Sequence, residues 1–468
     1  MSLLGAMNTA ISGLGVQSAA FGNISDDIAN SQTTGFKRVD TNFIDYLTTS
    51  TPTDNEPGAV VAVPDYVNTV QGTVSQSDNP LGLAISGQGF FAVSQSTSAP
   101  GANPTFSPQQ YYTRNGNFEM NAEGYLVNDA GEFLNGWVAG TNNVLNKTNI
   151  VPIQVSQTAY KPVPTGNVTL SANLPPAGNP DTTGLTDSLG DPKQDPVSST
   201  ISVYDAQGTA HQLTLSFTQT TAAEATAANG GTSAPAYWAL SVTDDSGNVI
   251  GAADLQFGAD GTLSAVLPGT AFVPGTPPTN AIAPATPPLF TTGTSGQQAT
   301  LALPTMYPTP TGGFQSLNLD LGKFDGTDGL TQFAASAYSL NGISQDGVPP
   351  GSFSSVTTTT SGDIVVNYTN GQSRTIAQVP VMTFAAPDSL QSQNGASFTA
   401  TTASGSALAD IAGTNGAGAL VTSSIEGSNV DLATEFSQLI VAQQAYSANA
   451  KVVTTASQLL QVTLDMKQ

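Results

Sequence analysis

The sequence predicts a mixed α and β fold, in which helices at the two chain ends pair as a coiled coil around a discontinuous, β-rich middle. Three observations support this class. Apolar residues recur at steps of three and four at both ends, as in coiled coils. Short strand-like runs between turn residues fill the middle. The formal charge is concentrated there as well. At 468 residues, the chain is long enough for about three domains.

The first helix is expected over residues 1–30. Four glycines in this stretch, Gly5, Gly13, Gly15 and Gly22, each cost about 1 kcal/mol relative to alanine. We therefore expect this helix to be unstable on its own. Its apolar stripe consists of Leu4, Met7, Ile11, Leu14, Phe21 and Ile28, with Ser18 and Ser25 at the remaining positions.

The last helix is expected over residues 428–468, which contain no glycine or proline. Ser428 or Asn429 is the expected N-cap. One alternative is that each helix packs on the core of its own domain, but its place at a nearly uncharged chain end favours pairing with the other helix and with neighbouring copies. The stripe consists of Leu432, Phe436, Leu439, Tyr446, Ala450, Val453, Leu460 and Leu464, with Gln443 and Ser457 as exceptions.

Strands are expected between the helices, in runs such as LTLSF (213–217), YWALSV (237–242), DIVVNY (363–368) and PVMTF (380–384). Asn-Gly pairs, among them Asn341-Gly342 and Asn370-Gly371, predict turns. Residues 171–199 and 268–313 are rich in Pro, Thr and Gly and are expected to be linkers or long loops.

These patterns predict a domain inserted into another domain. The terminal helical domain is assigned to residues 1–30 and 428–468, and its connecting segments to 31–70 and 416–427. An inner β-domain takes 71–165 and 323–415. An outer β-domain takes 166–322.

Charge and composition exclude several classes of protein. The first 35 residues carry two acidic and no basic side chains, and residues 428–468 carry three acidic and two basic ones, so −20 of the formal charge of −23 lies between them. Such a chain is not expected to bind nucleic acid or an anionic membrane surface. It has no cysteine, no apolar run long enough for a membrane span and no cleavable signal peptide pattern, so we expect no membrane insertion.

Signals for catalysis are weak, and we expect no catalytic, cofactor-binding or metal-binding residues. His211 is the single histidine, and a structural or surface role is expected for it. GQGFFA (87–92) matches a dinucleotide-binding pattern but continues as a strand. KFDGTDG, with Asp325 and Asp328, resembles only a fragment of a calcium loop. A secreted acidic enzyme such as a glycosidase is the alternative from another class, although no carboxylate spacing argues for it.

Several longer stretches resemble the family of bacterial flagellar rod and hook proteins. Within this family, two further stretches resemble the hook members in particular. Rod members lack a long middle segment such as this chain has. The similarity fades over 171–199 and 268–313. A distal rod protein is the nearest alternative, and flagellin is disfavoured because its terminal signatures are absent. The family stretches are ANSQTTGFKR (29–38), GLAISGQGFFAV (82–93), YTRNGNFEMNAEGYLVNDAGEFLNGW (112–137) and SNVDLATEFSQLIVAQQAYSANAKVVTTASQLLQ (428–461), and the hook-like ones are VYDAQGTAHQLTLSF (203–217) and SAYSLNGISQDGVPPGSFSSV (336–356).

The resemblance implies a homopolymer of identical subunits that forms a short, curved, flexible tube, joins the motor rod to the filament and transmits torque. It implies terminal helices that line the central channel and outer domains that slide as the tube bends. Implied partners are the rod, the hook cap, the hook–filament junction proteins and the flagellar type III export apparatus. The expected location is the bacterial flagellum, outside the cell after export without a cleaved signal peptide.

The resemblance also implies roles for the stretch after the first helix. Asn30 would end this helix with Ala29, and Gly35 would let the chain turn where a Cβ is unwelcome. Phe36 would occupy an apolar groove of a neighbouring subunit, and Lys37 and Arg38 would reach acidic groups on adjacent subunits. The alternative is an ordinary helix-to-loop exit with a solvated Lys-Arg pair.

Overall fold

The computed structural model is mostly β, with one helix near each chain end, which confirms this part of the predicted fold class. Helix α1 spans Leu3–Ala29 and helix α3 spans Leu432–Asp465. Contacts divide the chain into two compact units, Met1–Thr158 with Phe353–Gln468, and Ala159–Ser352. The structure describes residues 3–50, 55–98, 104–140, 144–176, 196–220, 237–268, 294–308 and 314–465.

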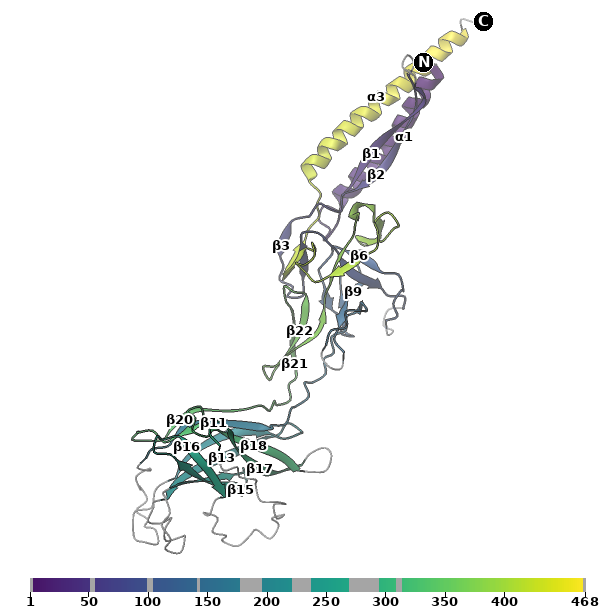
Figure 1. The fold of residues 1–468 in the computed structure, drawn as a ribbon. Coiled ribbons are helices and arrows are strands. Elements are labelled where there is room, and N and C mark those ends of the chain that lie inside the picture. Colours follow the sequence, from purple (N-terminus) through teal and green to yellow (C-terminus); the bar gives the residue numbers. More distant parts are fainter. Residues whose placement is uncertain are drawn as a thin grey trace, which may run out of the picture. The chain divides into compact units, whose positions relative to one another are not determined.

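The first unit contains a terminal bundle, by which we mean α1, α3 and the hairpin of β1 (Val39–Ser50) and β2 (Asn55–Tyr66). Figure 1 shows α1 and α3 side by side, with the hairpin running along α1. The hairpin is tied to α1 by polar contacts: Asn23 Nδ2 donates to Thr41 Oγ1 at 2.8 Å, and the Val60 amide donates to Ser12 Oγ at 3.2 Å. Residues 31–70 were expected to be a connecting segment, whereas Val39–Ser50 and Asn55–Tyr66 form this hairpin.

The rest of the first unit is built on an 11-stranded sheet, flanked by three two-stranded ones. Strand β5 is buried on both faces over Phe91–Ser94, and its first three residues are apolar. β29 and β28, close before α3, pair with β3 and β4, so the chain returns to its early strands before the last helix. The strands are β3 (Val74–Gln76), β4 (Leu83–Ser86), β5 (Phe91–Gln95), β6 (Tyr111–Thr113), β7 (Glu119–Met120), β8 (Leu126–Val127), β9 (Glu132–Val138), β10 (Val151–Pro152), β21 (Phe353–Thr358), β22 (Asp363–Tyr368), β23 (Ser373–Gln378), β24 (Val381–Thr383), β25 (Gln391–Gln393), β26 (Ser397–Thr399), β27 (Leu408–Asp410), β28 (Ala419–Thr422) and β29 (Ser424–Glu426), and a short 3-10 helix spans Pro387–Ser389.

The second unit holds two five-stranded sheets whose inner faces share one apolar core. Burial alternates along β14, where Trp238, Leu240 and Val242 point inward, as expected for a strand with one buried face. The strands are β11 (Asn167–Asn173), β12 (Val197–Tyr204), β13 (Ala210–Thr220), β14 (Tyr237–Thr243), β15 (Val249–Phe257), β16 (Leu263–Pro268), β17 (Gln298–Pro308), β18 (Phe314–Lys323), β19 (Leu330–Thr331) and β20 (Ser339–Gln345).

Some local expectations differ from the structure. Residues 298–308 form strand β17, although their composition suggested a loop. Asn341-Gly342 lies inside β20 at an irregularity of its pairing with β11, whereas Asn370-Gly371 does form the turn between β22 and β23. The predicted outer-domain limits, 166 and 322, both lie inside the second unit, because β19 and β20 pair with β11. The division into inner and outer domains stays a prediction.

Candidate functional site: the terminal bundle and its base

Helix α3 contacts α1 along a seam that recurs at steps of three and four residues. Ala442 and Ala456 are buried on this seam, and Phe21 of α1 packs edge-on against Tyr446 with ring centroids 6.3 Å apart. Of the predicted α3 stripe, Leu439, Ala450, Val453 and Leu460 are half-buried, whereas Gln443 and Ser457 are exposed. The role of this stripe in the helix contact stays a prediction. Large apolar residues guided that prediction, whereas small residues allow the two helices to approach closely.

The predicted stripe of α1 is not the face that this subunit buries most deeply. Ala10, Val16, Ala20 and Ile24 are the buried apolar residues of α1, while Ile11 is 49% exposed. Met7, Leu14, Phe21 and Ile28 are half-buried. The side chains of Leu4 and Leu464 lie outside the described ones.

Much of the apolar surface of α3 faces away from α1. On the hairpin, large apolar side chains are exposed on both strands, for example Tyr46 of β1 at 59% and Val61 of β2 at 43%. An exposed apolar surface that extends over a helix and a hairpin is unusual for a soluble monomer and indicates a contact site. Apart from Tyr446, which contacts Phe21 of α1, the exposed large apolar residues of α3 are Leu432, Phe436, Ile440, Val441, Val452, Leu459 and Val462.

The start of α3 is capped by Asp431 and not by Ser428 or Asn429. Asp431 Oδ1 accepts hydrogen bonds from the amides of Ala433 at 2.9 Å and Thr434 at 3.3 Å. Asn429 is engaged elsewhere, because its side chain accepts from the Arg38 amide and donates to the Val67 and Val70 carbonyls. Asn429 thus ties the entry of α3 to the segment that leaves α1.

The segment after α1 turns where the sequence predicted. Helix α1 ends at Ala29, and Asn30 bonds back to Asp26 through both its amide and its side chain. Gly35 has a φ of +70°, and its amide donates to the Glu426 carbonyl at 2.8 Å. A Cβ at Gly35 would collide with the backbone of Asn115, so glycine is required here for both conformation and space.

Lys37 lies inside its own subunit, which corrects the expectation that it reaches a neighbour. Its Nζ lies 2.6 Å from Glu426 Oε1 and also donates to the Val70 carbonyl at 2.7 Å. Burial lowers the pKa of Lys37, and the Glu426 carboxylate opposes this shift. Phe36, beside it, is half-buried, and its expected place in a groove of a neighbour stays a prediction.

Glu426 is shared by a second buried cation, Arg114, which no sequence pattern indicated. Arg114 Nη1 lies 2.8 Å from Glu426 Oε2, and the Gly72 amide donates to Oε1 at 2.9 Å. We call Lys37, Arg114 and Glu426 the basal ion cluster. It joins the α1 exit, the end of β6 and the end of β29, so it holds the base of the terminal bundle on the β-sheets.

Arg38 also interacts within the subunit. Its Nη2 lies 3.4 Å from Asp40 Oδ2 in a partly exposed pair. The expectation that Lys37 and Arg38 both serve adjacent subunits is therefore wrong for Lys37, and Arg38 has an acidic neighbour on β1 of its own chain.

The weak signals for catalysis have structural explanations. His211, at the start of β13, lies 2.9 Å from Asp245 Oδ2 through Nδ1 and 3.5 Å from Asp205 Oδ2 through Nε2, so it contacts acidic residues of two turns in the second unit. Lys323 pairs with Asp328 in the stretch that resembles a calcium loop, and Phe91 of GQGFFA begins β5. Within the described ranges, no three His, Cys, Asp or Glu side chains are placed to hold a metal ion.

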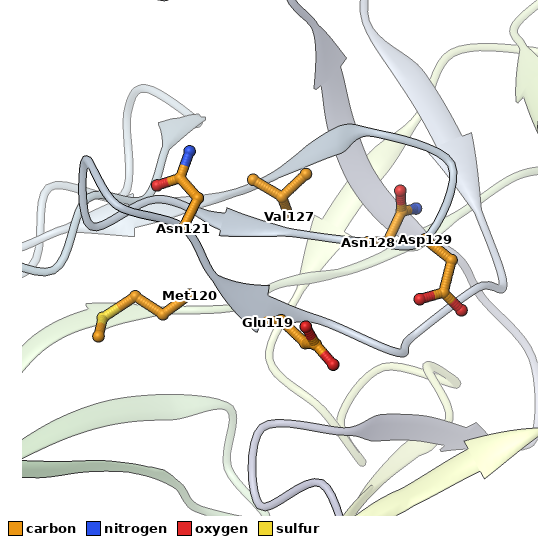
Figure 2. A pocket seen from close by; sticks show the side chains of 6 residues that line it. All are labelled: Glu119, Met120, Asn121, Val127, Asn128 and Asp129. Atoms are coloured by element: carbon orange, nitrogen blue, oxygen red, sulfur yellow. The ribbon is translucent and has the colours of Figure 1, made fainter. Parts of the chain in front are cut away.

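A shallow hollow lies at the β7–β8 hairpin, and Figure 2 shows its six lining side chains. Met120 and Asn121 lie at one end and Asp129 at the other, and the Asp129 carboxylate already accepts from Asn117 Nδ2 at 3.0 Å. The polar groups do not converge on a common point, so this hollow does not define a ligand site. Of the two helices, neither has a described stretch that is long and apolar enough to cross a membrane.

Models of three protein families match most of the chain in order. They are the flagellar hook protein FlgE/F/G D1 domain over residues 84–170, the flagellar basal body protein FlaE D2 domain over 170–348 and the flagellar basal body rod FlgEFG protein C-terminal over 421–466. Together with the two terminal helices, these matches define an axial structural protein of the bacterial flagellum.

Relatives along the whole chain make the assignment more specific. The chain is 28% identical to the flagellar hook protein FlgE of Rhizobium meliloti over 100% of both chains. It is also 28% identical to that of Salmonella typhimurium, over 98% of this chain and 99% of the relative. A crystal structure of Helicobacter pylori flagellar hook protein FlgE2 aligns with a TM-score of 0.45 and 14% identity, over 74% of this chain and 98% of that one.

The chain belongs to the flagellar hook proteins and is a structural subunit of the flagellar hook. This is a family of structural proteins that form homopolymeric parts of the flagellum, and it is not a family of enzymes. The distal rod alternative is not favoured.

Proposed function

We propose that the terminal bundle is the assembly surface through which this subunit forms a curved, flexible tube. In the tube, α1 and α3 pair as a coiled coil, and copies pack through the apolar residues that the pair leaves exposed. The tube couples the motor rod to the filament and transmits torque, while outer domains at larger radius slide as it bends.

One observation carries the proposal: α3 exposes large apolar side chains on faces that do not contact α1. Val441 is 65% exposed and Ile440 53% exposed, although both lie well inside a regular helix. Each such side chain gains about 1.5–3 kcal/mol when it is fully buried. Because the same contact repeats in every subunit, even a modest gain per copy favours a polymer.

The β1–β2 hairpin extends this surface. Phe43, Ile44 and Leu47 are exposed on β1, and Val61 and Val63 on β2. The nearly uncharged chain ends also favour close packing of copies, because like charges would repel one another in a crowded wall.

The remaining partners follow from the same role. A tube that begins on the rod and ends at the filament requires contacts with the rod, the hook cap and the hook–filament junction proteins. Export through the flagellar type III apparatus, without a cleaved signal peptide, would deliver the subunit to the growing end. No cofactor and no catalytic residue is part of this proposal.

The assembly surface is tested by a charge placed on α3. We expect Val441→Asp to block polymerisation, since it places a carboxylate in an apolar contact of every subunit. Polymer is measured by sedimentation and by electron microscopy of concentrated protein. Val144→Asp is the matched control, because Val144 is 70% exposed in the same unit but outside the terminal bundle, and it should assemble normally. Normal tubes from Val441→Asp would refute this assembly surface.

A further inference from the structure

Three acidic side chains from three different elements meet near the base of the terminal bundle. Asp27 lies in the last turn of α1, Asp40 in β1 and Glu435 in the first turn of α3. Asp27 is 1% exposed and Glu435 is 0% exposed. We call these three residues the acidic joint. It is separate from the basal ion cluster, where two cations compensate one carboxylate.

The acidic joint lacks comparable compensation. Both oxygens of Glu435 are buried without a hydrogen-bond partner among the described residues. Asp27 accepts from the Val39 amide at 3.1 and 3.3 Å. The nearby cation is Arg38, and its side chain is paired with Asp40 at 3.4 Å.

An ionised carboxylate is costly in such a place, and binding a proton removes most of that cost. Burial raises the pKa of Asp27 from its ordinary value of 3.8 to about 7; the Val39 hydrogen bond opposes this shift, and the charges of Glu435, Asp26 and Asp40 add to it. Burial likewise raises the pKa of Glu435, with Asp40 and Asp431 acting in the same direction and Arg38 against it.

The helix termini act in opposite directions on the two groups. Asp27 lies near the C-terminal end of α1, where the partial negative charge of the helix disfavours a second negative charge. Glu435 lies near the N-terminal end of α3, where the helix favours its ionised form. The effect of the helix terminus on Glu435 is smaller than the cost of burying an unpaired carboxylate.

We propose that the acidic joint is a proton-controlled latch between α1, β1 and α3, closed when Asp27 and Glu435 hold a proton and loosened when both are ionised. The α1–α3 contact is then conditional on pH, which is a property separate from the assembly surface itself.

The direction of the pH dependence follows from the raised pKa values. In the separated elements both carboxyls ionise near their ordinary values, whereas in the closed joint they retain the proton to a higher pH. The stability of the closed joint is therefore highest below about pH 4 and falls as the pH rises towards about 7, where the closed form also loses its proton.

Hydrogen exchange of the full chain tests the latch. Protection of backbone amides at 20–30 and 432–442 is measured at pH 5.5 and pH 8.5 and corrected for the intrinsic exchange rates. With one carboxyl titrating near 7, we expect the opening equilibrium to rise by about tenfold or more at the higher pH. Equal protection at the two pH values, or no protection at pH 5.5, would overturn the proposal.

Neutral variants separate a latch from a merely structural role. Asp27→Asn and Glu435→Gln should each keep high protection at pH 8.5 and reduce the pH response. Asp45→Asn is the matched control, because Asp45 is exposed on β1 and lies outside the acidic joint, and it should retain the wild-type response. If both buried variants lose protection equally at the two pH values, the carboxyls serve only as packing groups and the latch is refuted.

Discussion

Asn449 of α3 lies directly against Gly13 of α1. A Cβ placed on Gly13 would lie 2.8 Å from Asn449 Nδ2 and 3.2 Å from its Cγ. The polar side chain thus occupies space that only glycine leaves free. A polar residue on an apolar helix seam commonly fixes the register of the two helices, and here it has one complementary position along α1.

Alanine substitutions in α1 should therefore have different effects on helix stability at two nearby glycines. A Cβ added to Gly15 would meet no neighbouring side chain or other element within 4 Å, so Gly15→Ala should stabilise α1 by about 1 kcal/mol through helix propensity. Gly13→Ala must displace Asn449 and should lose this gain. Hydrogen exchange along α1 measures both, and equal stabilisation by the two variants would show that the Asn449 contact has no energetic weight.

Substitutions in the basal ion cluster should lower the free energy of unfolding of the first unit more than most others. Glu426→Gln leaves Lys37 and Arg114 buried without a charged partner, and we expect a loss of about 3–5 kcal/mol in the free energy of unfolding. Urea unfolding followed by the fluorescence of Trp137, in a Trp238→Phe background, reports on this unit.

An exposed ion pair is the control for the loss of stability expected from Glu426→Gln. Lys323 and Asp328 have side chains that are about half exposed, at 51% and 50%. Asp328→Asn should change stability by no more than about 1 kcal/mol, measured with Trp238 intact. If Glu426→Gln is as mild as this control, the cluster does not hold the bundle on the sheets.

Gly35 should tolerate alanine less well than another glycine with similar backbone angles. Gly371 has a φ of +78° with open space around it, so Gly371→Ala should cost only the left-handed conformation, about 1–2 kcal/mol. Gly35→Ala adds a collision with the Asn115 backbone and should cost clearly more. Thermal unfolding of both variants provides the comparison, and similar melting temperatures would contradict the tight packing at Gly35.

The second unit should be removable as a whole, but not between the limits suggested by the sequence. Tyr160 and Gly351 exchange backbone hydrogen bonds, the shorter at 2.7 Å, so the chain enters and leaves this unit side by side. Replacing 159–352 with a short Gly-Ser linker should leave a soluble first unit with intact circular dichroism. Replacing only 166–322 leaves β19 and β20 without β11, and this variant should aggregate. The opposite result would mean that the two units depend on each other for folding.

Elements with local signals were predictable from the amino-acid order. Apolar residues at steps of three and four, with no glycine or proline after Gly427, were sufficient to place α3, and alternating runs such as YWALSV located strands. The turn at Gly35 was also predictable, because only the conformation of a single residue was required. The same linear order of motifs identified the family.

The tertiary structure alone decided which residues meet. Lys37 and Glu426 are 389 positions apart, and no pattern near either one indicates the other. The buried apolar residues of α3 are the small Ala442 and Ala456, which a search for large apolar residues passes over. Asp27 and Glu435 are ordinary acidic residues in sequence, and only the burial that α1, β1 and α3 create together makes their charge costly.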